Sequence, residues 1–267
     1  MKAEPQVYSD AGSETYLDLQ AAAGITKHFG GYDATDELHR LCRLAEAHEV
    51  LEVGCGVGVG PAYIAKRYGC RVVGVDLSPQ MLAWAERRVQ REGVADRVTL
   101  QQANVLALPF EDNRFDATIA ESVLAFVEDK AAAIAEMIRV TRPGGYVGLN
   151  ESYWGQRPPE TSAQAWDSLG AVVLTADDWR ALWAAAALAE RVIAPRPWSL
   201  RREAGDRMRW LGWGEVFRAW GRILKLMTTH RELWRAVRTS LRAQTDTPKE
   251  VLRTFGYALF VGRKPGA

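Results

Sequence analysis

The sequence has little that would suit an exported, disulfide-bonded or membrane-spanning protein. Its 267 residues include only three cysteines, Cys42, Cys55 and Cys70. This odd, sparse set lacks the spacing of metal ligands, which argues against a disulfide framework or a zinc site and indicates a reducing compartment. The N-terminal stretch has no apolar core of the signal-peptide kind, and no apolar run reaches the roughly 18 residues that span a bilayer. We therefore expect a cytoplasmic protein that binds no metal.

Net charge is nearly absent as well, although the charges are unevenly distributed. The chain has 34 Lys and Arg against 33 Asp and Glu, which gives a net charge of +1 at pH 7. A near-neutral chain does not favour nucleic acid as a partner. Residues 195–253 nevertheless hold fourteen Lys and Arg against six Asp and Glu, together with five of the ten tryptophans. This shift in composition predicts a separate structural unit near the C-terminus.

Short apolar runs alternate with amphipathic stretches along the chain. They predict strands at 49–54, 71–76, 97–102, 115–121 and 145–151, a sixth strand at 190–200 and a last strand at 255–264. Such alternation is typical of βαβ units, in which helices cover both faces of a parallel sheet. The sequence therefore predicts an α/β fold with a doubly wound, mainly parallel sheet.

Capping residues mark where several helices begin. Ser, Thr and Asp side chains accept hydrogen bonds from the first helical N–H groups, and proline suits the first helical position. A patterned helix is expected at about 36–47 and a long helical stretch at about 202–243. The predicted starts are Ser78-Pro79, Asp129, Thr175 and Thr247-Pro248.

The first predicted strand runs into a glycine-rich loop, VLEVGCGVGVG, at residues 50–60. Glycines let the backbone turn sharply and approach a ligand, and the following helix offers unpaired N–H groups. A dinucleotide loop has the pattern Gly-x-Gly-x-x-Gly, but here Val59 stands in the third slot. The pattern that fits is acidic-x-Gly-x-Gly-x-Gly, which is typical of a loop holding the amino-acid tail of S-adenosylmethionine (SAM). Its residues are Glu52, Gly54, Gly56 and Gly58.

Asp76 ends the second predicted strand, 22 residues after Gly54. A carboxylate at this position can accept hydrogen bonds from both ribose hydroxyls of an adenosine. NAD enzymes place a carboxylate similarly, so Asp76 indicates an adenosine without deciding which one. The alternative is an exposed Asp that caps the next helix.

Four blocks of residues 36–151 resemble the class I SAM-dependent methyltransferases, in particular the broad group that includes the ubiquinone and menaquinone C-methyltransferases. The blocks, which follow one another at the spacing of that family, are VLEVGCGVG, VVGVDLSPQML, ALPFEDNRFDATIAESVLAFVED and EMIRVTRPGGYVGLNE. The resemblance implies a Rossmann-like sheet of seven strands with an antiparallel last strand. It also implies SAM as the cofactor and S-adenosylhomocysteine as its product.

The resemblance further implies a division of the chain and a set of cofactor contacts. We expect an N-terminal helical entry segment at 1–47, a SAM-binding core at 48–154, a substrate lid with the sixth strand and helices at 155–254, and a closing strand at 255–267. The implied contacts are Gly54 and Gly56 with the methionine moiety, Asp76 with the ribose, Leu77 with one adenine face, Asn104 with the adenine amine, and Val105 with the base through its backbone.

Glu121 and Glu151 are the main candidates for the chemistry, because they end adjacent strands where ligands sit in open α/β sheets. They could converge over the methyl group, where one takes a proton or both favour the cationic cofactor. The alternative is that Glu121 only binds the cofactor or a helix terminus. Many small-molecule members of the family carry His or Glu where this chain has Ala125.

His230 is a second candidate base, because it lies on the apolar face of the expected long helix. A lone histidine on such a face is more often a core residue. Tyr16 and His28 are weaker candidates in the entry segment, which folds over the cofactor in similar enzymes.

The basic, Trp-rich stretch is expected to form the lid. We expect Trp213, Phe217, Trp220 and His230 on its inner face. The alternatives are attachment to an anionic membrane through a basic amphipathic helix, and binding of an anionic substrate or RNA. The function that these patterns favour is methyl transfer from SAM to a small, partly apolar acceptor. An RNA or protein methyltransferase and a non-catalytic SAM-binding protein remain the competing interpretations.

Overall fold

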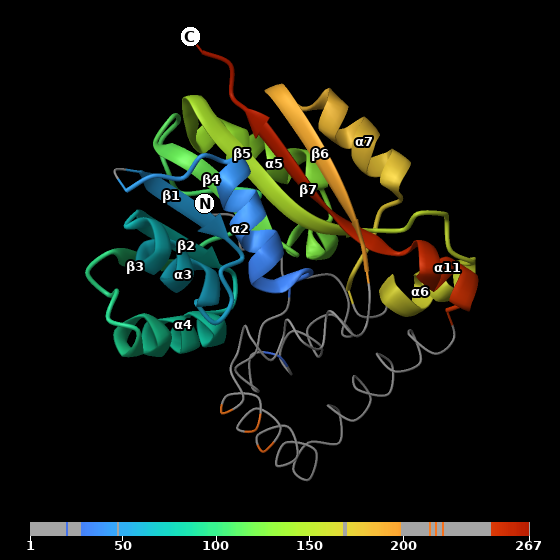
Figure 1. The fold of residues 1–267 in the computed structure, drawn as a ribbon, viewed down its shortest axis with the longest axis horizontal. Helices are drawn as coiled ribbons and strands as arrows, with labels where there is room; N and C mark the ends of the chain where they lie inside the picture. The colour runs from blue at the N-terminus through green and yellow to red at the C-terminus, as the bar shows by residue number, and fades with distance from the viewer. Residues whose placement is uncertain are drawn as a thin grey trace, which may run out of the picture.

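The computed structural model describes residues 28–46, 48–167, 170–198 and 247–266, together with Gln20, Gly214, Phe217 and Gly221. Its centre is a seven-stranded sheet with the order β3-β2-β1-β4-β5-β7-β6 (Figure 1). The strands are β1 (Glu49–Val53), β2 (Arg71–Asp76), β3 (Val98–Gln102), β4 (Phe115–Glu121), β5 (Thr141–Tyr153), β6 (Ala189–Pro197) and β7 (Gly256–Arg263).

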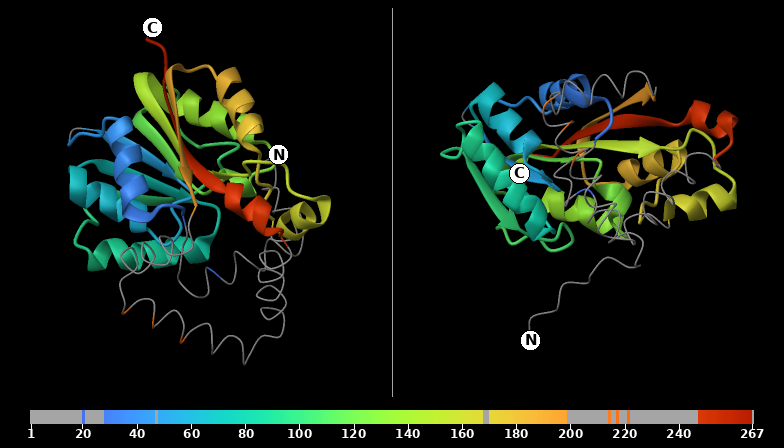
Figure 2. Two further views of the ribbon diagram at one scale, coloured as in Figure 1. Left: turned by 45° about the vertical axis from the view of Figure 1, so that its right-hand side comes forward. Right: turned by 90° about the horizontal axis from the view of Figure 1, so that it is seen from below.

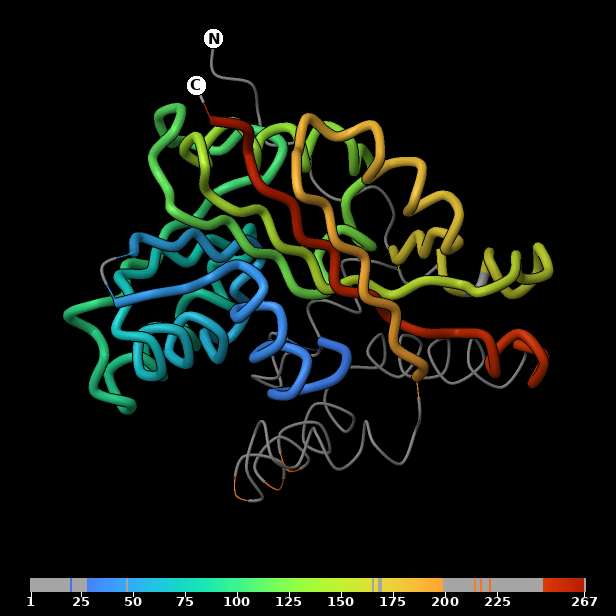
Figure 3. Tube along the Cα trace, turned by 45° about the horizontal axis from the view of Figure 1, so that its top comes forward, coloured from blue at the N-terminus to red at the C-terminus, as the bar shows by residue number. Residues whose placement is uncertain are grey.

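The sheet is parallel from β3 to β5, and only β7 runs against its neighbours. The β7 strand pairs antiparallel with both β5 and β6, and Figure 3 traces it in red between these two strands. The predicted seven-stranded Rossmann-like sheet with an antiparallel last strand is therefore confirmed. Because β1, β2, β4 and β5 are parallel, their carboxyl ends meet at one edge, where ligands bind in such sheets.

Helices cover both faces of the sheet, and each face has its own apolar cluster (Figure 2). The first cluster includes side chains of α2 (Gly31–Leu41), α3 (Val59–Tyr68), α4 (Pro79–Arg91) and α11 (Lys249–Thr254). The second includes side chains of α5 (Lys130–Val140) and α7 (Ala176–Ala185). The remaining described elements are the 3₁₀ helix η1 (Leu124–Phe126) and α6 (Glu160–Asp167).

Three of the predicted helix starts are confirmed by side-chain caps. The side chains of Ser78, Asp129 and Thr175 accept hydrogen bonds from the backbone N–H two or three residues into α4, α5 and α7. Thr175 also takes part in a capping box with Asp178. The short helix predicted after Pro248 is α11.

The helix predicted at about 36–47 is shifted in the structure. It is α2, which begins at Gly31 and ends at Leu41. Gly30 precedes the helix in the left-handed region with φ of +79°. Arg43 follows the helix with φ of +52°, and this backbone conformation does not continue a helix. The apolar spacing predicted which side of this helix is buried. It did not predict the backbone turns at Gly30 and Arg43, which set where the helix begins and ends.

One strand also differs from expectation. The β5 strand begins at Thr141, earlier than the predicted start at residue 145. The long helix predicted at 202–243 lies outside the described residues, apart from helical Gly214, Phe217 and Gly221. Within the described part of the chain, no helix combines the length and the apolar character that crossing a membrane requires.

Candidate active site

The glycine loop lies at the carboxyl end of β1, and its backbone needs glycine at two places in particular. Gly54 has φ of +66°, and a side chain there would strike Val123 in the loop after β4. Gly58 has φ of +76°, and a Cβ there would lie 2.8 Å from the Cα of Ala85 in α4. Both positions favour glycine because L side chains rarely adopt such φ values. The loop is therefore packed closely between α4 and the end of β4.

Asp76 holds this loop to the end of β2. Its Oδ2 accepts a hydrogen bond of 2.8 Å from the N–H of Gly56, and its Oδ1 accepts one of 2.9 Å from the N–H of Ser78. Burial raises the pKa of Asp76. A carboxylate has about four acceptor sites, so further donors can still bind it. Leu77 follows in a half-buried position, and its carbonyl accepts a hydrogen bond from Gln102.

Asn104 and Val105 begin the loop after β3. The side-chain oxygen of Asn104 accepts a hydrogen bond of 3.0 Å from the N–H of Leu106, so it is already part of a turn. Val105 is buried in the second apolar cluster. The expected contact of Asn104 with adenine would use the remaining acceptor site of this oxygen.

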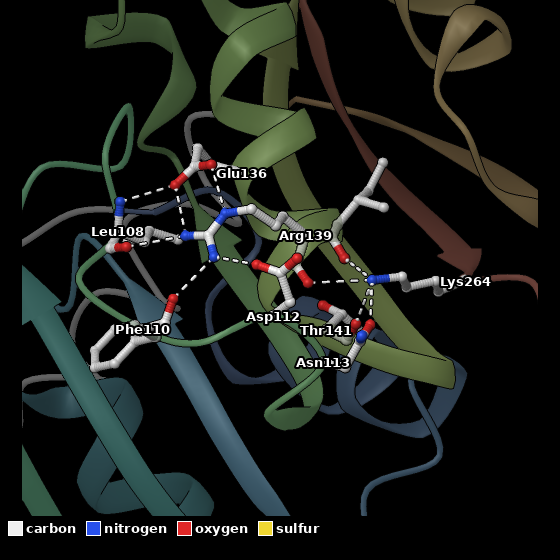
Figure 4. A network of polar contacts seen from close by, with 9 residues as sticks. Leu108, Phe110, Asp112, Asn113, Glu136, Arg139, Thr141 and Lys264 are labelled. Carbon is white, nitrogen blue, oxygen red and sulfur yellow. Dashed lines mark hydrogen bonds and ion pairs between the residues drawn. The ribbon is translucent and has the colours of Figure 1, made fainter. Parts of the chain in front are cut away.

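Arg139 of α5 binds the backbone of the loop that follows β3 (Figure 4). Its guanidinium donates to the carbonyls of Phe110 at 2.8 Å and Leu108 at 3.0 Å, and to Asp112 at 2.7 Å. Glu136 binds the same guanidinium and accepts the N–H of Leu108 at 2.9 Å. Both polar backbone groups of Leu108 are therefore held by α5.

Lys264 adds a second clamp beside the first (Figure 4). Its Nζ lies 2.8 Å from the carbonyl oxygens of Ile138 and Thr141, where α5 ends, and 2.7 Å from the side chain of Asn113. A cation at this place satisfies carbonyls that a helix end leaves unpaired. The segment after β7 thus fixes α5 and the loop that α5 supports.

Glu121 ends β4 and is held by side chains from two other elements. The hydroxyl of Thr35 in α2 lies 3.0 Å and 2.9 Å from its two oxygens. The amide of Asn150 in β5 donates to Oε2 at 3.1 Å and to the carbonyl of Phe29 at 2.8 Å. The Nδ1 of His28 lies 3.6 Å from the same Oε2. These groups come together only because β4 and β5 pair and α2 crosses above them.

Glu52 lies on the same face, below the start of α3. A Cβ at Gly60 would fall directly on its carboxyl group, which explains the fourth glycine of the loop. Burial, followed by the charge of Glu121, raises the pKa of Glu52 well above its usual range. Two carboxyl groups therefore lie close to the glycine loop, and a cation bound beside them would favour the charged form of Glu52.

Glu151 is on the opposite face of the sheet. Glu121 pairs in register with Asn150, and successive residues of a strand point to opposite faces. The Oε1 of Glu151 accepts the N–H groups of Val123 at 2.9 Å and Leu124 at 2.8 Å. Burial raises the pKa of Glu151 to about 7. This placement differs from the expected convergence of Glu121 and Glu151 over one point.

Within the part of the chain that the structure describes, several buried polar atoms at this edge of the sheet have no hydrogen-bond partner. They are Glu52 Oε2, Ser122 Oγ, Asn150 Oδ1 and Glu151 Oε2, from the ends of β1, β4 and β5. Buried polar groups usually have partners, so a group of such atoms favours a polar ligand. A groove of about 680 Å³, lined by Val89, Val98 and Leu100 among others, lies instead near the amino end of β3.

Some of the predicted site residues cannot be compared with the structure. Tyr16, Trp213, Trp220 and His230 lie outside the described residues. Phe217, which was expected on the inner face of the lid, is 68% exposed. Helical spacing shows which side chains share a face, but not which neighbour that face meets.

Comparison with known proteins agrees with this geometry. Residues 51–149 match a family model described as a methyltransferase domain. Over these residues the chain is similar to a methyltransferase domain, and two relatives that match part of the chain are named as methyltransferases. The matched residues include the glycine loop, Asp76 and Glu121, and the methyltransferase domain therefore contains most of the site described above.

Two relatives show how far the sequence similarity extends. The chain is 36% identical to the methyltransferase GfsG of Streptomyces halstedii over 119 residues, which are 45% of this chain and 43% of the relative. It is 40% identical to the demethylmenaquinone methyltransferase of Lactiplantibacillus plantarum over 117 residues, 43% of this chain and 49% of the relative. The chain thus spans less than half of these curated relatives.

Similarity in fold to solved structures covers nearly the whole chain, more than the similarity in sequence does. The crystal structure of the [4+2]-cyclase SpnF superposes with a TM-score of 0.72 at 21% identity, covering 98% of this chain and 96% of SpnF. At this identity the likeness concerns the fold alone.

Thr35 and Asn150 are site residues that the sequence interpretation did not name. Asn150 is a polar residue late in an otherwise apolar strand, and it is fully buried. Thr35 lies one turn before the buried Leu38 and His39 of α2, on the same helix face. Starting the expected helix at 36 left Thr35 out of the pattern.

Proposed function

We propose that this protein binds SAM and transfers its methyl group to a small, partly apolar acceptor. The observation that carries the proposal is the group of unpartnered buried polar atoms beside the glycine loop. The loop, Asp76 and these atoms lie at the carboxyl ends of adjacent parallel strands. SAM brings a sulfonium cation and a reactive methyl group, and the carboxyl groups of Glu52 and Glu121 suit such a cation.

In this proposal the chain's own residues bind and orient the cofactor. Asp76 accepts the ribose hydroxyls, for which it has acceptor sites beyond those used by Gly56 and Ser78. Leu77, Val105 and Asn104 surround the adenine, and the close backbone at Gly54 and Gly56 meets the methionine moiety. The Arg139 clamp keeps the loop after β3 in place for this purpose.

The acceptor is proposed as a small molecule on several grounds. Relatives that match this chain over part of their length are named for quinone, phosphoethanolamine and tocopherol substrates. The proposal assigns residues 155–254 to the lid, with Trp213, Phe217, Trp220 and His230 as candidates for contact with the acceptor. Glu121 is proposed to lie beside the sulfonium of the cofactor, whereas Glu151 is proposed to position the loop after β4. A cytoplasmic location completes the proposal, consistent with three buried cysteines that are all free thiols.

A protein with the same fold could also bind SAM without transferring its methyl group. SpnF is described as a cyclase, and one fold supports many reactions.

The first measurement is calorimetry, in which we expect binding of SAM and S-adenosylhomocysteine and no comparable binding of NAD. The second measurement incubates the protein with methyl-labelled SAM, a panel of phenols, amines and thiols, and fractionated cell extract. Binding of SAM without label in any fraction would favour a non-catalytic role or a cyclase-like one.

A further inference from the structure

The side chains around Glu121 hold its carboxyl group in a fixed position. Thr35 contacts both carboxyl oxygens and Asn150 donates to one of them, so two donors bind this group at 2.9–3.1 Å. With its oxygens bound in this way, the group is well suited to orient a neighbouring side chain.

His28 is a histidine whose ring faces the carboxyl group of Glu121. Its Nδ1 lies 3.6 Å from Glu121 Oε2, and both side chains are only 7% exposed. His28 comes from the segment that leads into α2, whereas Glu121 comes from β4, so the pair spans the entry segment and the ligand-binding edge of the sheet. A carboxylate facing Nδ1 favours the tautomer with the proton on Nδ1, which leaves Nε2 as the basic nitrogen.

We propose that His28 is the general base of this methyltransferase domain, with Glu121, Thr35 and Asn150 as its positioning residues. This inference rests on the proposed function. Ala125 stands where a base was expected from the family resemblance, and it is a buried alanine that cannot take a proton. His28 would supply the missing group from the segment that leads into α2.

Methyl transfer in this proposal is coupled to the loss of a proton from the acceptor. A lone pair of the acceptor's oxygen or nitrogen forms the bond to the methyl carbon, while the sulfur–methyl bond breaks and its electron pair stays on sulfur. The acceptor's O–H or N–H bond breaks, its pair remains on the acceptor atom, and the proton passes to Nε2 of His28. The imidazolium that results lies against the Glu121 carboxylate, which stabilises it.

His39 is the other histidine on this face, and it is a weaker candidate. It lies in α2 with no exposed surface, and neither ring nitrogen has a hydrogen-bond partner. Its ring packs against Tyr63 and Tyr68 of α3 rather than against Glu121.

The test separates proton removal from cofactor binding. Iodide accepts a methyl group without carrying a proton, whereas the phenols and amines of the labelled-SAM panel lose one. In the full chain, His28→Asn keeps a donor toward Glu121 but removes the base. We expect at least a 100-fold loss of transfer to the hydroxyl and amine acceptors, with less than a threefold change in transfer to iodide and in the dissociation constant of SAM. His48→Asn, a histidine outside the site, is the control.

The proposal would be overturned if His28→Asn lost transfer to iodide and to the proton-bearing acceptors equally. It would also be overturned if the rate of transfer to the proton-bearing acceptors did not change.

The tautomer of His28 can be measured without any acceptor, so this measurement tests the proposal separately from the proposed function. In ¹⁵N-histidine-labelled protein, we expect the His28 resonances, assigned by their loss in His28→Asn, to show the proton on Nδ1. We expect Glu121→Gln to weaken that preference, because the carbonyl of Phe29, 3.4 Å from Nδ1, remains as an acceptor. A His28 proton on Nε2 in the wild type would refute the pair, even if the protein methylates its acceptors.

Discussion

His39 gives a quantitative prediction about stability. The side chain is fully buried in α2, and its ring centroid lies 5.4 Å from that of Tyr68 in an edge-on contact. Burial lowers the pKa of His39 from 6.5 to about 4, although the nearby charges of Glu121 and Asp36 act in the opposite direction. Charging this ring would therefore cost free energy in the folded state that it does not cost in the unfolded chain.

The sign and size follow from proton linkage. Between pH 6.5 and 4 the unfolded chain binds a proton at this site that the folded protein does not, so stability falls as the pH falls through this window. Each pKa unit corresponds to about 1.36 kcal/mol. Two and a half units give an upper limit of about 3.4 kcal/mol, of which about 1.8 kcal/mol is lost between pH 7 and pH 5.

The assay is urea unfolding at pH 7 and pH 5. The His39→Phe variant keeps a ring against Tyr63 and Tyr68 but has no proton to bind. We expect the wild type to lose roughly 2 kcal/mol more than His39→Phe between these pH values. Other titrating groups are shared by the two proteins, so they cancel in this difference, and His48→Asn serves as a control. An identical pH dependence of wild type and His39→Phe would refute the reasoning.

The other predictions concern the cofactor site and the second buried carboxyl group. Glu151→Gln should remove an opposite pH effect: burial raises its pKa from 4.5 to about 7, so its stabilising proton is lost as the pH rises through 7. The wild type should lose roughly 2.5 kcal/mol of unfolding free energy relative to Glu151→Gln between pH 5 and pH 8, and parallel urea curves would contradict this. Asp76→Ala should weaken SAM binding by about 2–3 kcal/mol in calorimetry, with Asp96→Ala, which changes an exposed acid, as control. Gly58→Ala should lower the melting temperature and SAM affinity together, because its Cβ would meet the backbone of Ala85; unchanged values would show that the loop can adjust. Arg139→Lys should weaken SAM binding because lysine lacks the planar fork of donors that holds Leu108, Phe110 and Asp112 together, and full affinity would show that the loop after β3 needs no clamp.

The sequence alone determined the class of fold and the place of the cofactor loop. Strand–helix alternation, three capping residues and the spacing of Gly54, Gly56 and Gly58 are local patterns, and the physics behind them acts within a few residues. This is why the strands and the starts of α4, α5 and α7 agree with expectation, whereas the antiparallel β7 was expected from the family resemblance. The family resemblance supplied the rest, including the identity of the cofactor that the loop suits.

Tertiary structure decided which of the candidate side chains meet. Glu121 and Glu151 looked alike in sequence, yet the two-residue period of β5 places Asn150 beside Glu121 and turns Glu151 to the opposite face. Thr35 and His28 reach Glu121 only because α2 starts earlier than its apolar pattern suggested and crosses the ends of β4 and β5. Such contacts join residues up to 121 positions apart, as Phe29 and Asn150 are, and they depend on strand register and helix ends that no local pattern specifies.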